Sequence, residues 1–432
     1  MFDISEKAEL VEKAFLIGVF QTPAEQEESE SLLDELEALV ETLGIPVAEK
    51  QLIRVPKPSS RYFVGSGKAE EIAARAQALG ADLIVFDNEL QPAQQRNWEA
   101  LAKVAVIDRQ EVILDIFAQR AHTKEARLQV DLARLEYSLP RLTRAWQHLG
   151  RQAGGLGAKG EGETQLEADR RLVRRQIDRL KADLERVRAR RATQRKQRQR
   201  LPLPHAAIVG YTNAGKSSLL RRLTGADVLV EDKLFATLDP KTRRIDLDGG
   251  QKLLLTDTVG FVRNLPHRLV EAFKATLEEA TLADFLIHVV DASHPRVYDF
   301  YDTTMRVLSE LGADTRRVIT FLNKMDRMDK SSSLQALRLH FPDAVFGSTH
   351  TGAGLSELTH RCGEMLRDWV TRVELALPLS RTELISLLHR TSNVLSLDYD
   401  DRYANVVAMV SPRVFARVEP FVVRREPEFQ TA

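Results

Sequence analysis

The sequence predicts an α/β protein of four parts: a small N-terminal α/β domain, an antiparallel helical hairpin (coiled coil), a domain with a mostly parallel sheet, and a small C-terminal α/β domain. Two separate stretches alternate strand-like apolar runs with helical patterns, which is typical of parallel or mixed sheets. A long pattern of leucines at coiled-coil spacing lies between them. The chain has 432 residues, more than one hydrophobic core accommodates, so several domains are expected.

The N-terminal domain is expected over residues 1–121. Apolar runs of strand length alternate there with helical patterns, two of which end at a glycine. The expected strands are Phe15–Phe20, Gln51–Val55, Asp82–Phe86 and Val104–Ile107, and the expected helices are Ser29–Leu43, Lys68–Leu79 and Pro92–Leu101. This alternation indicates a small parallel or mixed sheet.

The helical hairpin is expected over residues 122–201. Two helical patterns carry apolar residues at steps of four and three, which is the spacing of a coiled-coil seam. A segment with six glycines, residues 150–163, joins them and should form the tip of the hairpin. Pro140 is expected to kink the first arm. The seam residues are Leu128, Leu132, Leu135, Leu139 and Leu142 in the first arm and Leu166, Val173, Ile177, Leu180, Leu184 and Val187 in the second.

An α/β pattern returns over residues 202–372, and a small domain over residues 373–432 follows. The last domain begins with an apolar run at Val373 and continues with a helix from Arg381. Strands are expected around Leu395–Asp398 and Ala404–Val410, with a short helix after them.

The charges are unevenly distributed, although the formal net charge is zero. Residues 24–49 hold nine acidic side chains and no Lys or Arg, whereas residues 166–200 hold fourteen basic side chains against five acidic ones. Such a basic excess suits contact with phosphates. The single cysteine, Cys362, excludes an intrachain disulfide. With no recognisable secretory signal or membrane-spanning run, we expect a cytoplasmic location, together with some peripheral membrane association.

The strongest chemical motif follows the expected strand His205–Val209. The run GYTNAGKS matches the P-loop template at each fixed position, and a helical pattern follows directly. Its glycines let N–H groups point at phosphate oxygens, Lys216 reaches the β- and γ-phosphates, and Ser217 ligates Mg²⁺. The nucleotide contacts expected here are Gly210, Tyr211, Thr212, Asn213, Ala214, Gly215, Lys216, Ser217 and Ser218.

Two further motifs end expected strands, in the order of a GTP-binding domain. Asp257 can hold Mg²⁺ through water, and the N–H of Gly260 can contact the γ-phosphate. Asp326 can accept both N–H donors of the guanine edge, which adenine lacks. Lys324 would lie along the base, and Asn323 would connect this loop to the P-loop. The expected contacts are Asp257, Thr258, Val259, Gly260, Asn323, Lys324, Met325 and Asp326.

Thr237 is the expected switch threonine, because it lies between the P-loop and Asp257 in the chain. Its segment Phe235, Ala236, Thr237, Leu238 and Asp239 is expected to contact the nucleotide. The expected Mg²⁺ ligands are Ser217, Thr237 and, through water, Asp257. The expected catalytic residues are Lys216, Thr237 and Gly260.

These motifs resemble those of the translation-factor-like GTPases, and the sequence is similar to the HflX family over about residues 50–370. The forms GYTNAGKS, FATLD and DTVGF are shared with that family. Outside the nucleotide motifs, the resemblance rests on Ile113–Arg120, Leu128–Tyr137, Gly160–Glu167 and Asp169–Arg171.

The resemblance implies a Mg²⁺-dependent, GTP-hydrolysing factor that binds the large (50S) ribosomal subunit and its ribosomal RNA. Such a factor splits or rescues ribosomes under stress, with its glycine-rich loop reaching toward the peptidyl-transferase region. We expect a monomer that exchanges GTP and GDP. The basic second arm of the hairpin independently favours RNA contact, because phosphate contacts are largely electrostatic.

Two positions depart from common patterns. Phe261 follows Gly260 where Ras-like enzymes carry the glutamine that orients water, so intrinsic hydrolysis is expected to be slow. The other departure is in the loop over the guanine base, where the family usually has Ser-Ala-Lys. Here Ser348, Thr349 and His350 are the expected contacts; Thr349 would act through its backbone N–H, and His350 can pack differently against the base.

Slow hydrolysis leaves a second hypothesis open: an RNA- or ribosome-binding module whose nucleotide only sets its conformation. Ribosome-dependent stimulation of turnover would distinguish the two. A second, ATP-dependent activity in the N-terminal domain is suggested for the family, but residues 1–121 supply no phosphate loop. Val64–Lys68 lacks the earlier glycine and the Ser or Thr that should follow the lysine.

Overall fold

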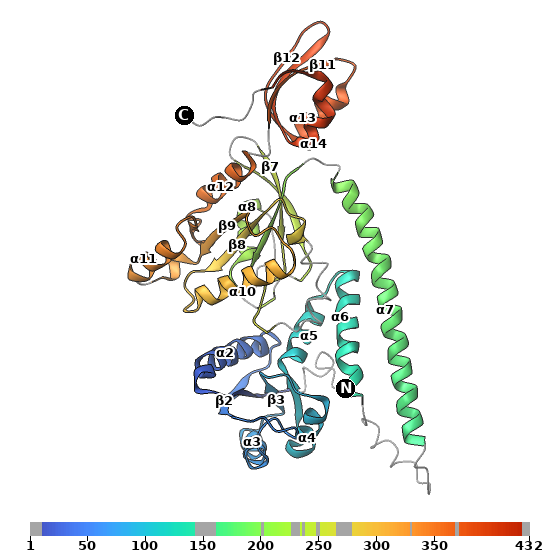
Figure 1. Ribbon diagram of the computed structural model, residues 1–432, viewed down its shortest axis with the longest axis vertical. Helices are drawn as coiled ribbons and strands as arrows, with labels where there is room; N and C mark the ends of the chain where they lie inside the picture. Colours follow the sequence, from blue (N-terminus) through green and yellow to red (C-terminus); the bar gives the residue numbers. More distant parts are fainter. Residues whose placement is uncertain are drawn as a thin grey trace. The chain divides into compact units, whose positions relative to one another are not determined.

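The computed structural model forms two compact units, and the predicted fold class is confirmed (Figure 1). The first unit comprises Met1–Arg188, Lys233–Leu238 and Arg263–Lys274, and the second comprises Ala189–Asp232, Asp239–Val262 and Ala275–Ala432. The residues described are 11–142, 161–199, 203–225, 234–235, 238–247, 251–264, 279–328, 331–367 and 371–425.

The first unit is built on a four-stranded parallel sheet in the order β2-β1-β3-β4. Strand β1 is buried at every position because helices cover both faces of the sheet. Helices α3 and α4 pack on one face, while α2 and α5 pack together on the other. The strands are β1 (Ala14–Phe20), β2 (Val47–Arg54), β3 (Leu83–Phe86) and β4 (Ala105–Asp108), and the helices are α2 (Gln26–Thr42), α3 (Ser66–Leu79), α4 (Pro92–Ala102) and α5 (Arg109–Arg120).

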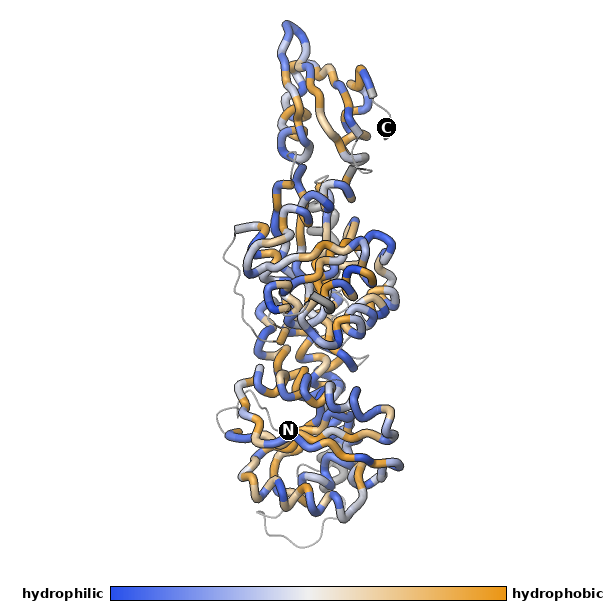
Figure 2. The backbone as a smooth tube through the Cα atoms, turned by 90° about the vertical axis from the view of Figure 1, so that its left-hand side faces the viewer, coloured by the Kyte–Doolittle hydropathy of each residue, from blue (hydrophilic) through white to orange (hydrophobic). Residues whose placement is uncertain are grey.

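All the strands and helices expected in this domain are present, within a few residues of their expected ends. Helix α5 is additional, and it begins where the Asp108 carboxylate accepts a hydrogen bond from the Glu111 N–H. Figure 2 shows hydrophobic residues concentrated in the strands of the sheets.

Helices α6 (Lys124–Ser138) and α7 (Glu161–Gln199) pack through the predicted leucine seam. Helix α6 ends at Ser138 and continues as the 3₁₀ turn η2 (Leu139–Arg141), so Pro140 ends the helix instead of kinking it. Residues 150–160 of the glycine-rich loop lie outside the described residues, and residues 161–163 belong to α7. The buried seam residues are Leu132, Ile177 and Leu184, and Leu128, Leu135, Leu139, Val173 and Leu180 flank them.

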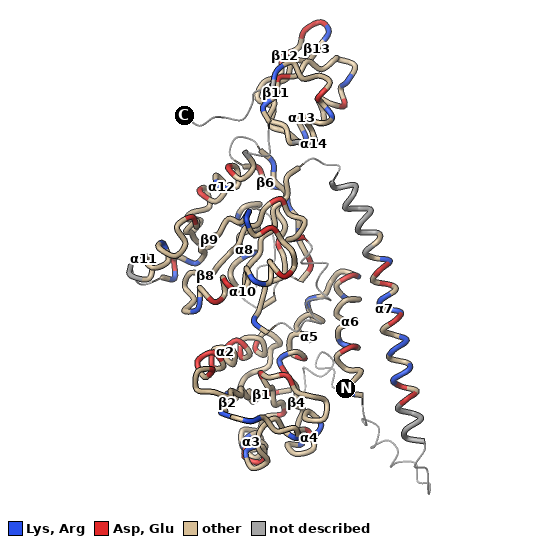
Figure 3. The backbone as a smooth tube through the Cα atoms, in the orientation of Figure 1, with Lys and Arg blue, Asp and Glu red and all other residues tan. Residues whose placement is uncertain are grey.

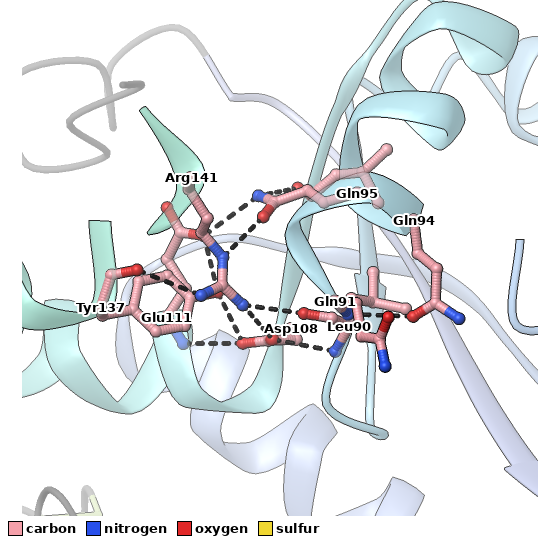
Figure 4. A network of polar contacts seen from close by, with 9 residues as sticks. Leu90, Gln91, Gln94, Gln95, Asp108, Glu111, Tyr137 and Arg141 are labelled. Carbon is pink, nitrogen blue, oxygen red and sulfur yellow. Dashed lines mark hydrogen bonds and ion pairs between the residues drawn. The ribbon is translucent and has the colours of Figure 1, made fainter. Parts of the chain in front are cut away.

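A buried polar network joins the end of α6 to the carboxyl edge of the first sheet (Figure 4). The Arg141 guanidinium donates to the Leu90 carbonyl at 2.8 Å, pairs with Asp108 at 3.3 Å and lies 3.5 Å from the centre of the Tyr137 ring. The Tyr137 hydroxyl donates to Asp108 at 3.0 Å. Burial, and then the charge of Asp108, raise the pKa of Glu111 to about 8. Parallel sheets often bind ligands at this edge, but here the protein's own side chains occupy it beside β4.

The second unit contains a six-stranded sheet in the order β10-β9-β8-β5-β7-β6, which is parallel except for the β6–β7 pair. Helices α8 and α12 pack on one face and α10 and α11 on the other. The strands are β5 (His205–Gly210), β6 (Lys241–Asp246), β7 (Lys252–Asp257), β8 (Phe285–Asp291), β9 (Val318–Asn323) and β10 (Val345–Phe346). The helices are α8 (Lys216–Thr224), α10 (Val297–Glu310), α11 (Ser331–His340) and α12 (Leu355–Arg367), with the 3₁₀ turn η4 (Met325–Arg327) after β9.

The C-terminal part of the second unit is a four-stranded antiparallel sheet in the order β12-β13-β11-β14. Its β-α-β-β-α-β chain order is that of the ferredoxin-like fold. The elements are β11 (Thr371–Pro378), α13 (Thr382–Thr391), β12 (Asn393–Tyr399), β13 (Tyr403–Val410), α14 (Pro412–Val418) and β14 (Val422–Arg425). Across the described residues of the chain, no helix is long and apolar enough to cross a membrane.

Candidate nucleotide-binding site

The P-loop lies at the topological switch point of the six-stranded sheet. Strand β5 pairs with β8 on one side and with β7 on the other, and its carboxyl end leads into helix α8. In open α/β sheets this position forms a crevice beyond the strand ends, where ligands bind. The first turn of α8 also directs its backbone N–H groups into that space.

Two glycines of the P-loop have conformations that a side chain would prevent. Gly210 has a φ of +148°, and a Cβ there would lie 2.2 Å from the Val289 carbonyl oxygen. Gly215 has a φ of +99°, and its Cβ would lie 2.2 Å from Asn323 Nδ2. The close approach of Gly210 to the backbone of β8, and of Gly215 to the Asn323 side chain, therefore requires glycine at both positions.

Lys216 and Ser217 are held by polar partners from the surrounding loops. The buried Lys216 Nζ donates to the Tyr211 carbonyl at 2.7 Å, and Ser217 Oγ donates to Asp257 Oδ2 at 2.6 Å. Burial lowers the pKa of Lys216 to about 8, against the opposing effect of Asp257. The hydroxyl and the carboxylate are hard oxygen donors of the kind that Mg²⁺ prefers.

Gly260 and Phe261 are fastened to the P-loop by the backbone. Thr212 N donates to the Phe261 carbonyl at 2.8 Å, and Phe261 N donates to the Gly210 carbonyl at 3.1 Å. A Cβ on Gly260 would lie 2.8 Å from Thr212 and 2.9 Å from Lys216 Nζ, so the chain passes directly over the P-loop lysine. The Phe261 side chain is only 1% exposed. The side chain is therefore buried inside the protein.

The two predicted base-binding loops are tied together. Asn323 is fully buried; its Nδ2 donates to the Ala214 carbonyl at 2.8 Å, and its Oδ1 accepts from Thr349 N at 2.9 Å. The Ser348 hydroxyl donates to Asp326, and this hydrogen bond lowers the pKa of the Asp326 carboxyl group. The carboxylate is thus held ionised, in the form that accepts two N–H donors.

His350 and Lys324 flank this pair of loops. His350 Nδ1 lies 3.7 Å from Asp326 Oδ2, and its side chain is 88% exposed. Lys324, with a φ of +63°, pairs with Asp291 at 2.8 Å. Asp291 ends strand β8 and was not among the predicted site residues, although a strand that ends in an aspartate is the signal that identified Asp257.

Helix α10 supports the P-loop with an aromatic contact that no sequence motif indicated. The Tyr211 ring stacks on Phe300 with 3.9 Å between centroids and 2° between planes. His288 on β8 stacks on Tyr301 of the same helix, at 4.9 Å. Burial, and next the charge of Lys216, lower the pKa of His288 to about 3, so this histidine is neutral beside the P-loop.

The predicted switch segment is described only in part. Ala236 and Thr237 lie outside the described residues, whereas Phe235 and Leu238 are each 2% exposed and belong to the first unit. Asp239 begins a stretch of the second unit. Thr258, after β7, donates from Oγ1 to the Ile208 carbonyl at 2.7 Å.

A P-loop at the switch point of this sheet, followed by an Asp-x-x-Gly turn after β7 and an Asn-Lys-x-Asp loop after β9, defines a P-loop GTPase. Family models match three successive parts of the chain: "GTP-binding GTPase N-terminal" over residues 30–118, "GTP-binding GTPase Middle Region" over 120–198, and "50S ribosome-binding GTPase" over 205–324.

Proteins named GTPase HflX match nearly the whole chain. The GTPase HflX of Akkermansia muciniphila is 49% identical over 98% of this chain and 100% of its own length. That of Escherichia coli is 43% identical over 88% of both chains. A crystal structure of a GTP-binding protein from Sulfolobus solfataricus with GDP is 24% identical over 82% of this chain and 98% of that one, with a TM-score of 0.44. The chain belongs to the HflX family, and it is a GTP-hydrolysing enzyme.

Proposed function

We propose that this GTPase docks on the large (50S) ribosomal subunit through its helical hairpin, contacts ribosomal RNA there, and splits or rescues ribosomes under stress. The observation that carries the proposal is the basic surface of α7. The seam residues of α7 face α6. Figure 3 shows Lys and Arg residues distributed along the described part of α7. The side chains of Arg171 and Arg186 are 68% and 72% exposed, and Arg175 and Arg179 are exposed as well. RNA phosphates are the natural partners of such a surface.

In this proposal the site residues have distinct roles. The P-loop N–H groups and Lys216 hold the phosphates. The Asp326 carboxylate accepts hydrogen bonds from the guanine edge, and Asn323 holds the two base loops together. Thr349 N–H would reach the base from the second loop. Thr237 and Gly260 would close on the γ-phosphate, the two switch contacts of this enzyme class.

The residues present also fit a magnesium ion. Ser217 and Thr237 would hold it directly and Asp257 through water, since the Ser217 hydroxyl already lies 2.6 Å from the Asp257 carboxylate. When bound, Mg²⁺ neutralises charge on the β- and γ-phosphates.

The burial of Phe261 supports a stimulated enzyme. Its side chain cannot hydrogen-bond water, so another group must orient the nucleophile. A ribosome that supplies or positions that group would make turnover depend on docking. The matched domain model is described as ribosome-binding, which agrees with this proposal. We further propose that the protein acts in the cytoplasm as a monomer.

The test is GTP and ATP turnover with and without 50S subunits, at two salt concentrations. Strong stimulation of GTP turnover that fades with salt is expected, because displaced counterions make phosphate contacts salt-dependent. A variant with Arg175→Glu and Arg179→Glu should lose most of the stimulation. Arg316→Glu, at an 89% exposed position far along the chain, is the matched control and should keep it.

The second candidate is a binding module with negligible turnover, and the buried Phe261 is the observation that favours it. Turnover that 50S subunits leave unchanged, while salt-sensitive binding to them persists, would select this module. Absence of any binding to the subunits would contradict both candidates.

A further inference from the structure

Asp291 ends strand β8 at the edge of the sheet where both nucleotide loops begin. In the sheet, β8 lies between β5, which leads into the P-loop, and β9, which leads into the Asn-Lys-x-Asp loop. Asp291 stands opposite Asn323 in the register of β8 and β9, and Ala292 N donates to the Asn323 carbonyl at 2.9 Å. The sheet therefore places this carboxylate beside the loop that is expected to bind the guanine base.

The Asp291 carboxylate is fixed by its own strand end. Ser293 N donates to Oδ1 at 3.0 Å, and Ser293 Oγ donates to the same oxygen at 2.6 Å. Aspartate side chains commonly form such a turn with the backbone two residues on. Because Oδ1 accepts two hydrogen bonds, rotation of the carboxylate would break both. The other oxygen, Oδ2, faces Lys324, whose Nζ lies 2.8 Å away.

Lys324 is the flexible member of this pair. It follows strand β9 directly, and its φ of +63° lies in the left-handed region. A lysine side chain has high rotamer entropy, so an unpaired ammonium group would sample many positions around the loop. The side chains of Lys324 and Asp291 are only 14% and 17% exposed, so water screens their attraction less than that of a surface pair. The ion pair therefore orders the lysine by contacts within the protein.

Asp291 also balances charge between the two nucleotide loops. Burial, against the opposing charge of Asp257, and then the charge of Lys324 lower the pKa of Lys216 to about 8. The ammonium groups of Lys216 and Lys324 therefore repel each other. A carboxylate bonded to Lys324 offsets this repulsion and favours a position of that lysine at the base loop.

We propose that Asp291 is a positioning residue for guanine-nucleotide binding: its ion pair holds the Lys324 side chain in the place where that side chain lies along the base. The inference rests on the proposed nucleotide site, in which the sequence predicts this position for Lys324. A nucleotide then meets a lysine that is already ordered, so less conformational entropy is lost on binding. Selection of the base stays with Asp326, whose carboxylate accepts the guanine N–H donors.

The main test is Asp291→Asn in the full chain. The amide oxygen can still accept from Ser293, so the turn is kept while the negative charge is lost. Hydrogen bonds to charged groups are among the stronger ones in proteins, so GDP and GTP should each bind about tenfold weaker. The two losses should be equal, because the γ-phosphate lies at the other end of the nucleotide. The KM for GTP should rise with kcat unchanged, since the contact is the same in the ground state and the transition state.

The matched control is Asp314→Asn, which removes the carboxylate of another ion pair in the second unit. Asp314 pairs with Arg316 at 2.9 Å, and its side chain is 43% exposed. Because such a surface pair contributes little, GDP affinity of this variant should stay within about twofold of the unmodified protein.

A double-mutant cycle shows whether Asp291 acts through Lys324. Lys324→Gln should by itself weaken GDP binding, and Asp291→Asn should then add at most about a twofold further loss. Ser293→Ala removes one of the two bonds to Oδ1 and keeps the charge, so it should weaken binding in the same direction but less. The loss in Asp291→Asn should persist at high salt, because salt screens a partly buried pair far less than the long-range field of the site.

The proposal is overturned if Asp291→Asn binds GDP as tightly as the unmodified protein or more tightly, or if its loss is equally large in the Lys324→Gln background. A loss that is much larger for GTP than for GDP, or that disappears at high salt, would also overturn it. Unchanged GDP affinity of Lys324→Gln would instead contradict the position predicted for that lysine. Failure of the unmodified protein to bind GDP would contradict the nucleotide site itself, so these failures are distinguishable.

Discussion

Replacing Asn323 with alanine tests how the nucleotide site is held together. Asn323 is fully buried, and its amide bridges the Ala214 carbonyl at 2.8 Å and the Thr349 N–H at 2.9 Å. Alanine would leave both backbone groups buried without this partner. Each such loss costs about 1–3 kcal/mol, so the second unit should lose about 2–6 kcal/mol of stability.

Part of that cost should also appear in nucleotide affinity. The Ala214 and Thr349 groups belong to the phosphate loop and the base loop, and a nucleotide needs both loops in register. If the variant relaxes to satisfy one orphaned group, binding must reverse that relaxation. One hydrogen bond of about 1.4 kcal/mol then corresponds to about tenfold weaker GDP binding.

The assay is a fluorescent GDP titration combined with amide exchange of β9 and α12. Asn405→Ala is the matched control, because Asn405 is an exposed asparagine of the C-terminal sheet that bonds Asp400. Asn323→Ala with GDP affinity within about twofold of the unmodified protein, and with unchanged β9 exchange, would refute the bridging role.

Three further outcomes are expected. Asp326→Asn should shift base preference from guanine to xanthine, since an amide NH₂ can donate to the O2 of xanthine. Competition between GTP and XTP measures this preference, and a retained preference for GTP would contradict the assignment of the base pocket. Burial raises the pKa of Glu111 from 4.5 to about 8 in the folded protein. Between these two pH values Glu111 is protonated in the folded protein and ionised in the unfolded chain. Stability should therefore fall as the pH rises through this window, by up to about 1.4 kcal/mol per pH unit. Glu111→Gln should flatten this decline in pH-dependent unfolding of the first unit, and an equal slope in both proteins would count against it. Phe261→Ala should destabilise the second unit by about 3–5 kcal/mol, because it leaves a cavity in the core. Phe261→Gln should not speed intrinsic hydrolysis, because the side chain at this position is buried. Faster single-turnover hydrolysis by Phe261→Gln would contradict this expectation.

Most of the fold could be predicted because its signals are local. Strands such as β1 and β3 are apolar runs between breakers, and the seam of α6 and α7 repeats every three to four residues. Helix α5 was missed because it starts without a gap after β4, so the change from strand to helix depends on the cap at Asp108 instead of a visible linker. The end of α6 at Ser138 depended on whether Pro140 bends or ends a helix, which its neighbours alone do not decide.

The candidate site likewise contains residues that the sequence could predict and contacts that it could not. The P-loop, Asp257, Gly260, Asn323 and Asp326 were recognised because their chemistry requires particular residues at fixed spacing. Tyr211 was included only as a member of the motif, and its stacking on Phe300 depends on how α10 crosses the sheet. That crossing is set by packing between elements far apart in the chain, so no pattern within the sequence displays it.

A buried ion pair in the first unit shows the same limit. Arg263 and Glu35 are separated by 228 positions, and each is unremarkable among its neighbours, one in a loop and the other on an acidic helix. Only the fold shows that Glu35 is shared between Arg263 and the buried Arg109, and all three residues belong to the first unit. A motif specifies which residues meet the nucleotide, because the ligand constrains their chemistry. No ligand constrains the contact between Arg263 and Glu35, so only its burial and its partners in the fold reveal it.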